Sequence, residues 1–102
     1  MGLVTEVYEL THSFPGHELY GLTNQIRRSA VSIPSNIAEG AARGSKKDFL
    51  RFVFIARGSL AELETQLLIS SNLNYLQDTE PTLSHVNDIR KMLAGLAKSL
   101  ES

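Results

Sequence analysis

Hydrophobic residues recur every three or four positions along nearly the whole chain, which is typical of amphipathic α-helices. No stretch of Val, Ile or Thr alternates with polar residues over five or more positions as a β-strand would. Turn-forming residues separate four helical segments, at about residues 3–13, 22–42, 45–73 and 79–101. The pattern therefore predicts an all-α fold in a single domain over residues 1–102.

The connections after the first helix are short, which forces consecutive helices to be antiparallel. We therefore expect an up-down-up-down antiparallel four-helix bundle. Pro34 lies inside the second segment, and a proline there removes an amide donor and clashes with the preceding turn. We expect this helix to be kinked at Pro34; the alternative is two short helices broken between Ile33 and Pro34. We expect Gly40 and Gly44 to end it.

The third segment has the strongest helical pattern. Ser45 begins it in a capping-box-like arrangement, with its hydroxyl able to accept a free amide and Asp48 near the positive helix end. The stripe predicted to face the core consists of Phe49, Phe52, Val53, Ala56, Leu60, Leu63, Leu67 and Ser70. A second stripe, offset by one position, consists of Leu50, Phe54, Ala61 and Leu68. One stripe suffices for packing in a bundle, so the second predicts a subunit interface of a homo-oligomer.

Composition and charge narrow the possible functions. The 102 residues include 10 Lys and Arg and 11 Asp and Glu, a formal net charge of −1, so the chain as a whole is neither strongly basic nor strongly acidic. The absence of cysteine excludes disulfides, thiolate zinc sites and cysteine nucleophiles, and it fits a cytoplasmic location. The apolar runs are too short to span a membrane, and we expect no secretory signal at the N-terminus.

Signatures of catalysis and metal binding are few. Glu9 and His12 form one Glu-x-x-His pair, whereas a di-iron site in a bundle needs two such pairs and two further glutamates. Neither His17 nor His85 has a glutamate three residues before it. The sequence also lacks a nucleophile elbow, a phosphate loop and a dinucleotide-binding glycine motif. We therefore expect no enzyme activity, no metal and no cofactor.

Four positive charges fall within nine residues where the second helix gives way to the third: Arg43, Lys46, Lys47 and Arg51. A basic loop and helix N-terminus can contact phosphates through side chains and free amides together, so these are candidate nucleic-acid-binding residues. The alternative is an ordinary solvated helix end. That alternative is favoured because Phe49, the only aromatic among them, belongs to the core stripe.

A second group of charged residues flanks the packed stripes of the second and third helices: Arg28, Glu39, Arg57, Glu62 and Glu64. Charged residues beside a packed seam usually pair across helices or across subunits and fix the register. We assign these residues a structural role.

Several stretches in the middle of the chain resemble the bacterial four-helix bundle proteins known from intervening sequences in 23S ribosomal RNA genes. Residues 20–40 read YGLTNQIRRSAVSIPSNIAEG, residues 43–45 read RGS, residues 49–52 read FLRF and residues 55–67 read IARGSLAELETQL. The resemblance is specific because it fixes polar and glycine identities as well as the hydrophobic pattern. The accessory variability determinant proteins of diversity-generating retroelements are similar in kind.

This resemblance implies a four-helix bundle that assembles into a ring of five subunits, without established catalysis. It also implies a role near RNA, DNA or a nucleic-acid enzyme such as a reverse transcriptase. Members of that family commonly have a longer first helix with a Val-Trp-Gln-like stretch. This sequence contains no tryptophan, so we expect a short first helix here. We therefore expect a non-catalytic homo-oligomeric scaffold; the alternative is a nucleic-acid-binding module or an adaptor for a nucleic-acid enzyme.

Overall fold

The computed structural model describes residues 2–101, which form four α-helices and one short 3₁₀ turn. In chain order the elements are α1 (Gly2–Thr11), η1 (Gly16–Glu18), α2 (Leu22–Ala42), α3 (Lys46–Asn72) and α4 (Glu80–Glu101). No β-strand occurs among these residues. The prediction of an all-α fold with four helices is confirmed. None of the helices is long and apolar enough to cross a membrane within the described residues.

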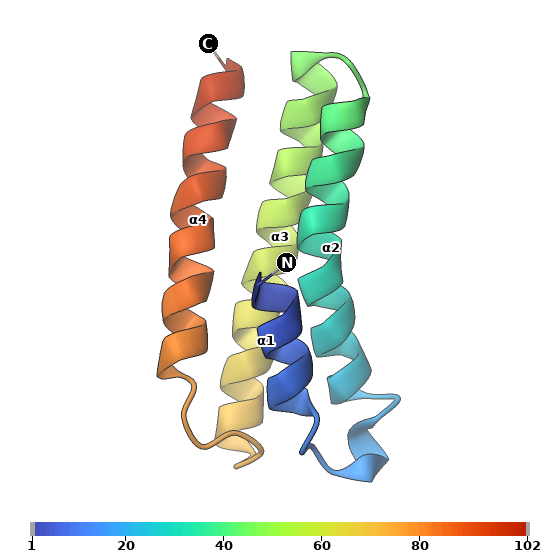
Figure 1. The fold of residues 1–102 in the computed structure, drawn as a ribbon, viewed down its shortest axis with the longest axis vertical. Coiled ribbons are helices and arrows are strands. Elements are labelled where there is room, and N and C mark those ends of the chain that lie inside the picture. The colour runs from blue at the N-terminus through green and yellow to red at the C-terminus, as the bar shows by residue number, and fades with distance from the viewer. Residues whose placement is uncertain (1, 102) are drawn as a thin grey trace.

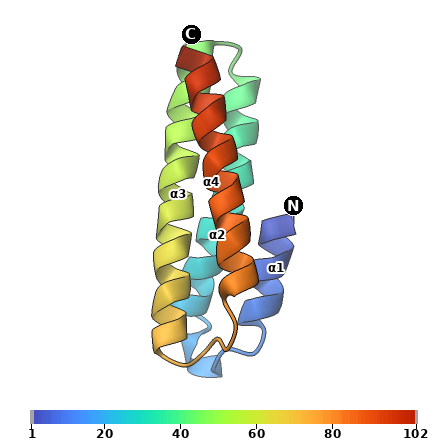
Figure 2. The same ribbon diagram turned by 90° about the vertical axis from the view of Figure 1, so that its left-hand side faces the viewer.

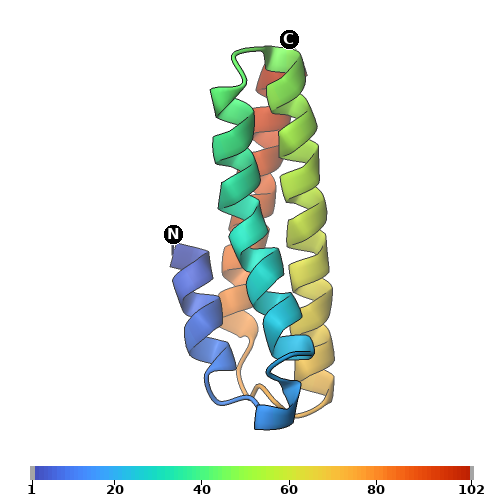
Figure 3. The same ribbon diagram turned by 90° about the vertical axis from the view of Figure 1, so that its right-hand side faces the viewer.

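The helices lie side by side in a rod with extents of 44 × 24 × 18 Å. The connection from α2 to α3 lies at one end, and those from α1 to α2 and from α3 to α4 lie at the other (Figure 1). α1 has 10 residues, whereas α2 has 21 and α4 has 22. Figures 2 and 3 show that α1 therefore accompanies its neighbours along only part of their length.

The core forms where the apolar stripes of the four helices meet. Val7 of α1, Ile26 of α2, Leu63 of α3 and Val86 of α4 are all fully buried. The predicted core stripe of α3 is buried from Phe52 to Ser70, and Phe49 at its start is partly buried. Burying a large apolar side chain contributes about 1.5–3 kcal/mol, so these stripes hold the helices in place.

The end of α1 and the start of α3 follow local chemistry. Ser45 is extended, and its Oγ accepts a hydrogen bond from the Asp48 amide at 3.1 Å, which confirms the predicted N-cap. α1 ends at Thr11, two residues before the predicted end. The Phe14 amide still donates to the Thr11 carbonyl at 3.1 Å, but Pro15 follows and disfavours helical backbone at the residue before it.

α2 differs from expectation at Gly40. The helix is continuous through Pro34 to Ala42, so the alternative of two separate helices is wrong, while a kink at Pro34 stays a prediction. Gly40 lies inside the helix and is buried, so the prediction that it ends α2 is wrong. Gly44, with a φ of 82°, adopts the left-handed backbone that glycine favours just after a helix.

The loops at the η1 end of the bundle are tied together by Tyr75. Its phenol donates a hydrogen bond to Glu18 Oε2 at 3.0 Å, and its ring lies 5.4 Å from that of Phe14. The hydrogen bond to Glu18 raises the pKa of Tyr75 above its ordinary value of 10.0, with smaller contributions from desolvation and from the negative charge of Glu18. The connection between α3 and α4 is thereby attached to the segment that precedes α2.

Candidate self-association surface

α3 buries one side in the bundle and leaves a second apolar side exposed. In the predicted second stripe, Phe54 and Leu68 are each 47% exposed, Ala61 is exposed and Leu50 is partly buried. The chain therefore does not use Phe54 and Leu68 fully in its own core. Whether this stripe is the subunit interface stays a prediction.

Exposed residues of α3, all of them apolar except Glu62, form two adjacent rows, each with a seven-residue spacing. The Phe54 row consists of Phe54, Ala61 and Leu68; the Ile55 row consists of Ile55, Glu62 and Ile69. Ile55 and Ile69 are 42% and 43% exposed, and Glu62 between them is also exposed. Because an α-helix has about 3.6 residues per turn, the two rows point about 100° apart.

The two rows border different helices. The Phe54 row borders α4, because Phe54 and Ala61 line a shallow depression together with Gly58 and with Arg90 of α4. The Ile55 row borders α2, because Glu62 lines a pocket whose opposite wall is α2. α3 therefore presents two surfaces of different composition.

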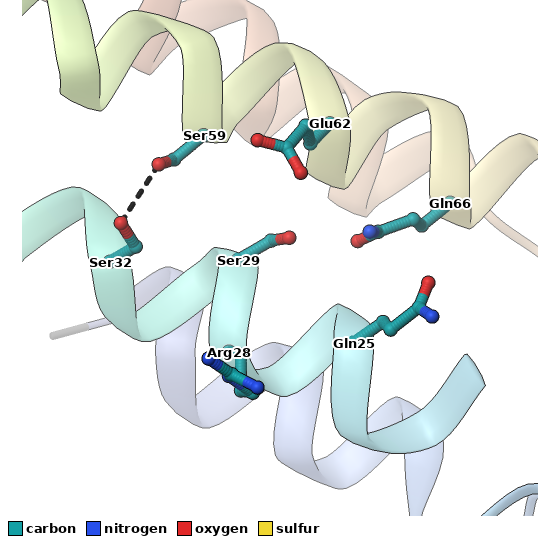
Figure 4. Close-up of a pocket in the computed structure, with 7 residues that line it drawn as sticks. All are labelled: Gln25, Arg28, Ser29, Ser32, Ser59, Glu62 and Gln66. Carbon is teal, nitrogen blue, oxygen red and sulfur yellow. Dashed lines mark hydrogen bonds between the residues drawn. The ribbon is translucent and has the colours of Figure 1, made fainter. Parts of the chain in front are cut away.

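The pocket beside the Ile55 row, which we call the polar pocket, has a volume of about 290 Å³ (Figure 4). Its lining is polar throughout: Gln25, Arg28, Ser29 and Ser32 from α2, and Ser59, Glu62 and Gln66 from α3. Figure 4 shows Glu62 and Gln66 extending from α3 towards α2, where Ser29 and Gln25 face them. All the lining residues fall in the stretches 20–40 and 55–67, which also carry the resemblance described above.

Hydrogen bonding in the polar pocket is incomplete. Ser32 Oγ and Ser59 Oγ are 2.8 Å apart and bond to each other across the two helices. Gln66 Oε1 is buried and has no hydrogen-bond partner among the residues that the structure describes. Glu62 and Arg28 make no ion pair with any residue that the structure describes. Two acceptors of the pocket, the exposed Glu62 carboxylate and the buried Gln66 carbonyl, therefore lack a partner among the described residues.

Arg28 and Glu62 are predicted from the sequence as structural polar residues, whereas the pocket that they share is not predicted. The available signal is a polar stripe on each helix, at positions 25, 28, 29 and 32 and at positions 59, 62 and 66. This spacing follows helical periodicity as the apolar stripes do. A polar stripe alone is typical of a solvated helix face, so the sequence does not show that the two stripes face each other.

The four candidate nucleic-acid-binding residues, Arg43, Lys46, Lys47 and Arg51, are all exposed near the connection between α2 and α3. Arg43 Nη2 lies 2.8 Å from Glu39 Oε1. The guanidinium groups of Arg43 and Arg51 lie 5.0 Å and 4.6 Å from the centre of the Phe52 ring. Lys46 and Lys47 make no ion pair with a described residue, so their charges are less engaged within the subunit than those of Arg43 and Arg51.

The five residues predicted to form structural polar pairs, Arg28, Glu39, Arg57, Glu62 and Glu64, do not pair with one another in the described chain. Glu64 Oε1 accepts a hydrogen bond from Arg90 Nη2 at 2.7 Å and so links α3 to α4. Glu39 pairs with Arg43. The Arg57 guanidinium lies 5.6 Å from the centre of the Phe54 ring and makes no ion pair within the described residues. Pairing across subunits stays a prediction.

An apolar groove of about 700 Å³ lies between α2 and α4, and the first turn of α1 also lines it. Its lining includes Val4, Ile33, Ile37, Ile89, Met92 and Leu96. Met92 is 70% exposed at its edge. No Cα of α2 lies within 8 Å of a Cα of α4 among the described residues, so the two helices do not close the groove.

The histidines provide no metal centre in the described part of the chain, which contains no group of three or more side chains suited to hold a metal ion. His12 is exposed just after the end of α1. His85 Nδ1 lies 2.8 Å from Glu6 Oε2, and Thr82 Oγ1 donates to Glu6 Oε1 at 2.8 Å. The His85 ring therefore helps to attach α1 to α4.

Comparison with known protein families identifies the family of this chain. No curated protein matches the chain significantly. The sequence model of one family, described as 23S rRNA-intervening sequence protein, matches residues 1–95. The match takes in α1, α2, α3 and most of α4, including every residue of the polar pocket and of both rows on α3. The chain therefore belongs to the family of 23S rRNA-intervening sequence proteins.

Proposed function

We propose that this protein is a non-catalytic homo-oligomeric scaffold whose subunits assemble into a ring through α3. The observation that carries the proposal is the exposure of Phe54, Leu68, Ile55 and Ile69 on a helix whose other side is already buried. Covering the exposed half of each side chain contributes about 1 kcal/mol per residue. Four such residues in every interface favour association.

The different composition of the two rows supports a head-to-tail contact. The Phe54 row of one subunit packs against the Ile55 row of the next, and contacts between unlike surfaces generate a ring when the rotation closes. In a closed ring the two contact directions of a subunit diverge by about 90° for four subunits and about 108° for five. The rows diverge by about 100°, which is closest to these two states. We favour five subunits, the state that the family resemblance implies.

The proposal is tested by Phe54→Glu, with Met92→Glu as the matched control. Met92 is an exposed apolar residue of α4 outside both rows. In native mass spectrometry we expect the wild-type protein and the control at five times 11.2 kDa, and the Phe54 variant at 11.2 kDa with unchanged helicity. A monomeric wild-type protein would refute the scaffold. A Phe54 variant that remains assembled would show that α3 is not the interface.

A second candidate function is binding of RNA or DNA, directly or as an adaptor for a nucleic-acid enzyme such as a reverse transcriptase. It is favoured by the exposure of Lys46 and Lys47, which make no ion pair within residues 2–101, at the start of α3 beside Arg43 and Arg51. A ring repeats this basic end around its axis. A chain of net charge −1 then still presents one basic surface.

This candidate is tested by measuring affinity for a single-stranded RNA at several salt concentrations. Phosphate contacts give an affinity that falls steeply with salt. We expect replacement of Arg43, Lys46, Lys47 and Arg51 by glutamine to abolish most of the binding and its salt dependence, and Lys91→Gln on the outer face of α4 to have little effect. Unchanged binding by the four-site variant would refute a role for this end of the bundle.

A further inference from the structure

We infer that the polar pocket between α2 and α3 receives the Arg57 side chain of the neighbouring subunit, with its guanidinium bonded to the Glu62 carboxylate. The occupant is a second copy of this chain, so the inference rests on the proposed function. It adds to that function a specific polar contact that sets the register between subunits.

The chemistry of the pocket favours a guanidinium as its occupant. Gln66 Oε1 is buried without a partner, and Glu62 makes no ion pair with any described residue. The Ser29 hydroxyl faces them from α2 (Figure 4). A buried acceptor without a partner is unfavourable, and here acceptors converge beside a carboxylate. A cation with several N–H donors, such as a guanidinium, complements a carboxylate in these polar surroundings.

Arg57 is available to pair with a residue of a neighbouring subunit. It lies next to the Phe54 row, with its guanidinium 5.6 Å from the centre of the Phe54 ring, and makes no ion pair with a described residue. The other arginines of α3 and α4 make closer contacts within their own subunit. Arg51 stacks on a phenyl ring at 4.6 Å, and Arg90 bonds to Glu64 at 2.7 Å.

The positions of Arg57 and Glu62 along α3 allow the two residues to meet across the interface between subunits. In a head-to-tail contact between the two rows, Arg57 of one subunit lies beside the pocket of the next. Subunits of a ring share the same height, and five helical positions separate the two residues by about 7.5 Å along the axis. Both side chains tilt towards the N-terminus to the same extent, so the tilt does not change this separation. The long arginine and glutamate side chains span it.

The same geometry excludes pairing of Arg57 with Glu62 inside one subunit. Five positions along an α-helix correspond to a rotation of about 140°, so the two side chains point to different sides of α3. Any energetic coupling between them is therefore coupling between subunits.

The competing partner for Glu62 is Arg28, which lines the same pocket from α2. The two residues make no ion pair in the structure. If Arg28 were nevertheless the partner in solution, replacing Glu62 would lower the stability of each subunit and leave association between subunits unchanged.

The test is a double-mutant cycle on the full chain, with association measured by sedimentation equilibrium and folding by urea denaturation. The variants are Arg57→Gln, Glu62→Gln and the two combined, with Lys91→Gln as the control. We expect each single substitution to raise the subunit dissociation constant about tenfold or more, and the combination to raise it no further. We expect the control to leave it unchanged.

Three results would overturn the inference, and they differ from one another. Additive effects in the combined variant, about a hundredfold, would show that Arg57 and Glu62 do not touch. A Glu62→Gln variant that unfolds more easily but associates normally would assign Glu62 to Arg28. A wild-type protein that is monomeric would refute the proposed ring itself, whereas the first two results leave the ring intact.

Discussion

Gly40 of α2 lies directly against Phe52 of α3. A Cβ atom at position 40 would lie 2.7 Å from Phe52 Cβ and 3.0 Å from Phe49 Cδ1, which is closer than non-bonded carbon atoms approach. A glycine inside a helix costs about 1 kcal/mol relative to alanine. At this position the cost is offset by the close approach of two helices near the loop that joins them.

We therefore expect Gly40→Ala to lower the free energy of unfolding by about 1–3 kcal/mol, because the added methyl group forces α2 and α3 apart. Urea denaturation measures the change. Gly95→Ala in α4 is the matched control, since nothing lies within 4 Å of a Cβ at that position. The control is expected to raise the free energy of unfolding by about 0.5–1 kcal/mol. If both variants were stabilised equally, the tight contact at Gly40 would be disproved.

Glu6 attaches α1 to α4 through both of its carboxylate oxygens, which lie 2.8 Å from Thr82 Oγ1 and from His85 Nδ1. We expect Glu6→Ala to reduce the free energy of unfolding by about 1–2 kcal/mol, because the buried Thr82 hydroxyl loses its acceptor. Thermal denaturation at neutral pH measures this effect. Glu9→Ala, at an exposed position of the same helix, controls for the loss of a charge and should change little. Equal effects at both positions would contradict the role of Glu6.

The Tyr75–Glu18 hydrogen bond makes part of the stability depend on pH. The folded protein raises the pKa of Tyr75 above 10.0, so it holds this proton more tightly than the unfolded chain does. The bond therefore stabilises the fold at all pH values below the unfolded pKa, and this contribution is lost as the pH rises through the raised folded pKa. We expect wild type to be more stable than Tyr75→Phe at pH values up to about 9, and the difference to shrink above about 10.

Thermal denaturation of the two proteins across this pH range measures the difference. Tyr20→Phe is the control, since Tyr20 is almost fully exposed and its substitution should leave the pH dependence of stability unchanged. A difference between wild type and Tyr75→Phe that stays constant with pH would show that the phenol proton is not shared with Glu18.

Hydrophobic spacing was sufficient to predict the four helices and most of the core. Leu60, Leu63 and Leu67 follow one helical stripe and are all buried, because a helix in a bundle has one side that leaves water. Ser45 was predicted as an N-cap because the capping bond joins residues three positions apart in the chain. These features depend on local sequence alone, so they can be derived without knowing the neighbours.

Gly40 and the polar pocket could not be derived in this way. A glycine within a helical pattern either ends the helix or leaves room for a neighbouring helix to approach closely. At Gly40 the position of Phe52 on α3 shows that the second explanation applies. Likewise Gln66 is an ordinary polar residue until α2 covers its carbonyl oxygen. Both features depend on which residues of α2 face α3, and that register is set by the packing of the whole bundle.

The short first helix gives the bundle two ends of unequal resistance to local unfolding. Beyond the start of α1, α4 runs beside α3 (Figure 2), and no Cα of α4 lies within 8 Å of a Cα of α2 among the described residues. Segments with fewer buried contacts open at lower free-energy cost, and their amide hydrogens exchange faster. We therefore expect the last turns of α4 to exchange before the part of α4 around Val86, which lies near α1 and α3. The C-terminal end of α4 is the part that we expect to open first, and the end closed by Phe14 and Tyr75 the part that we expect to unfold last.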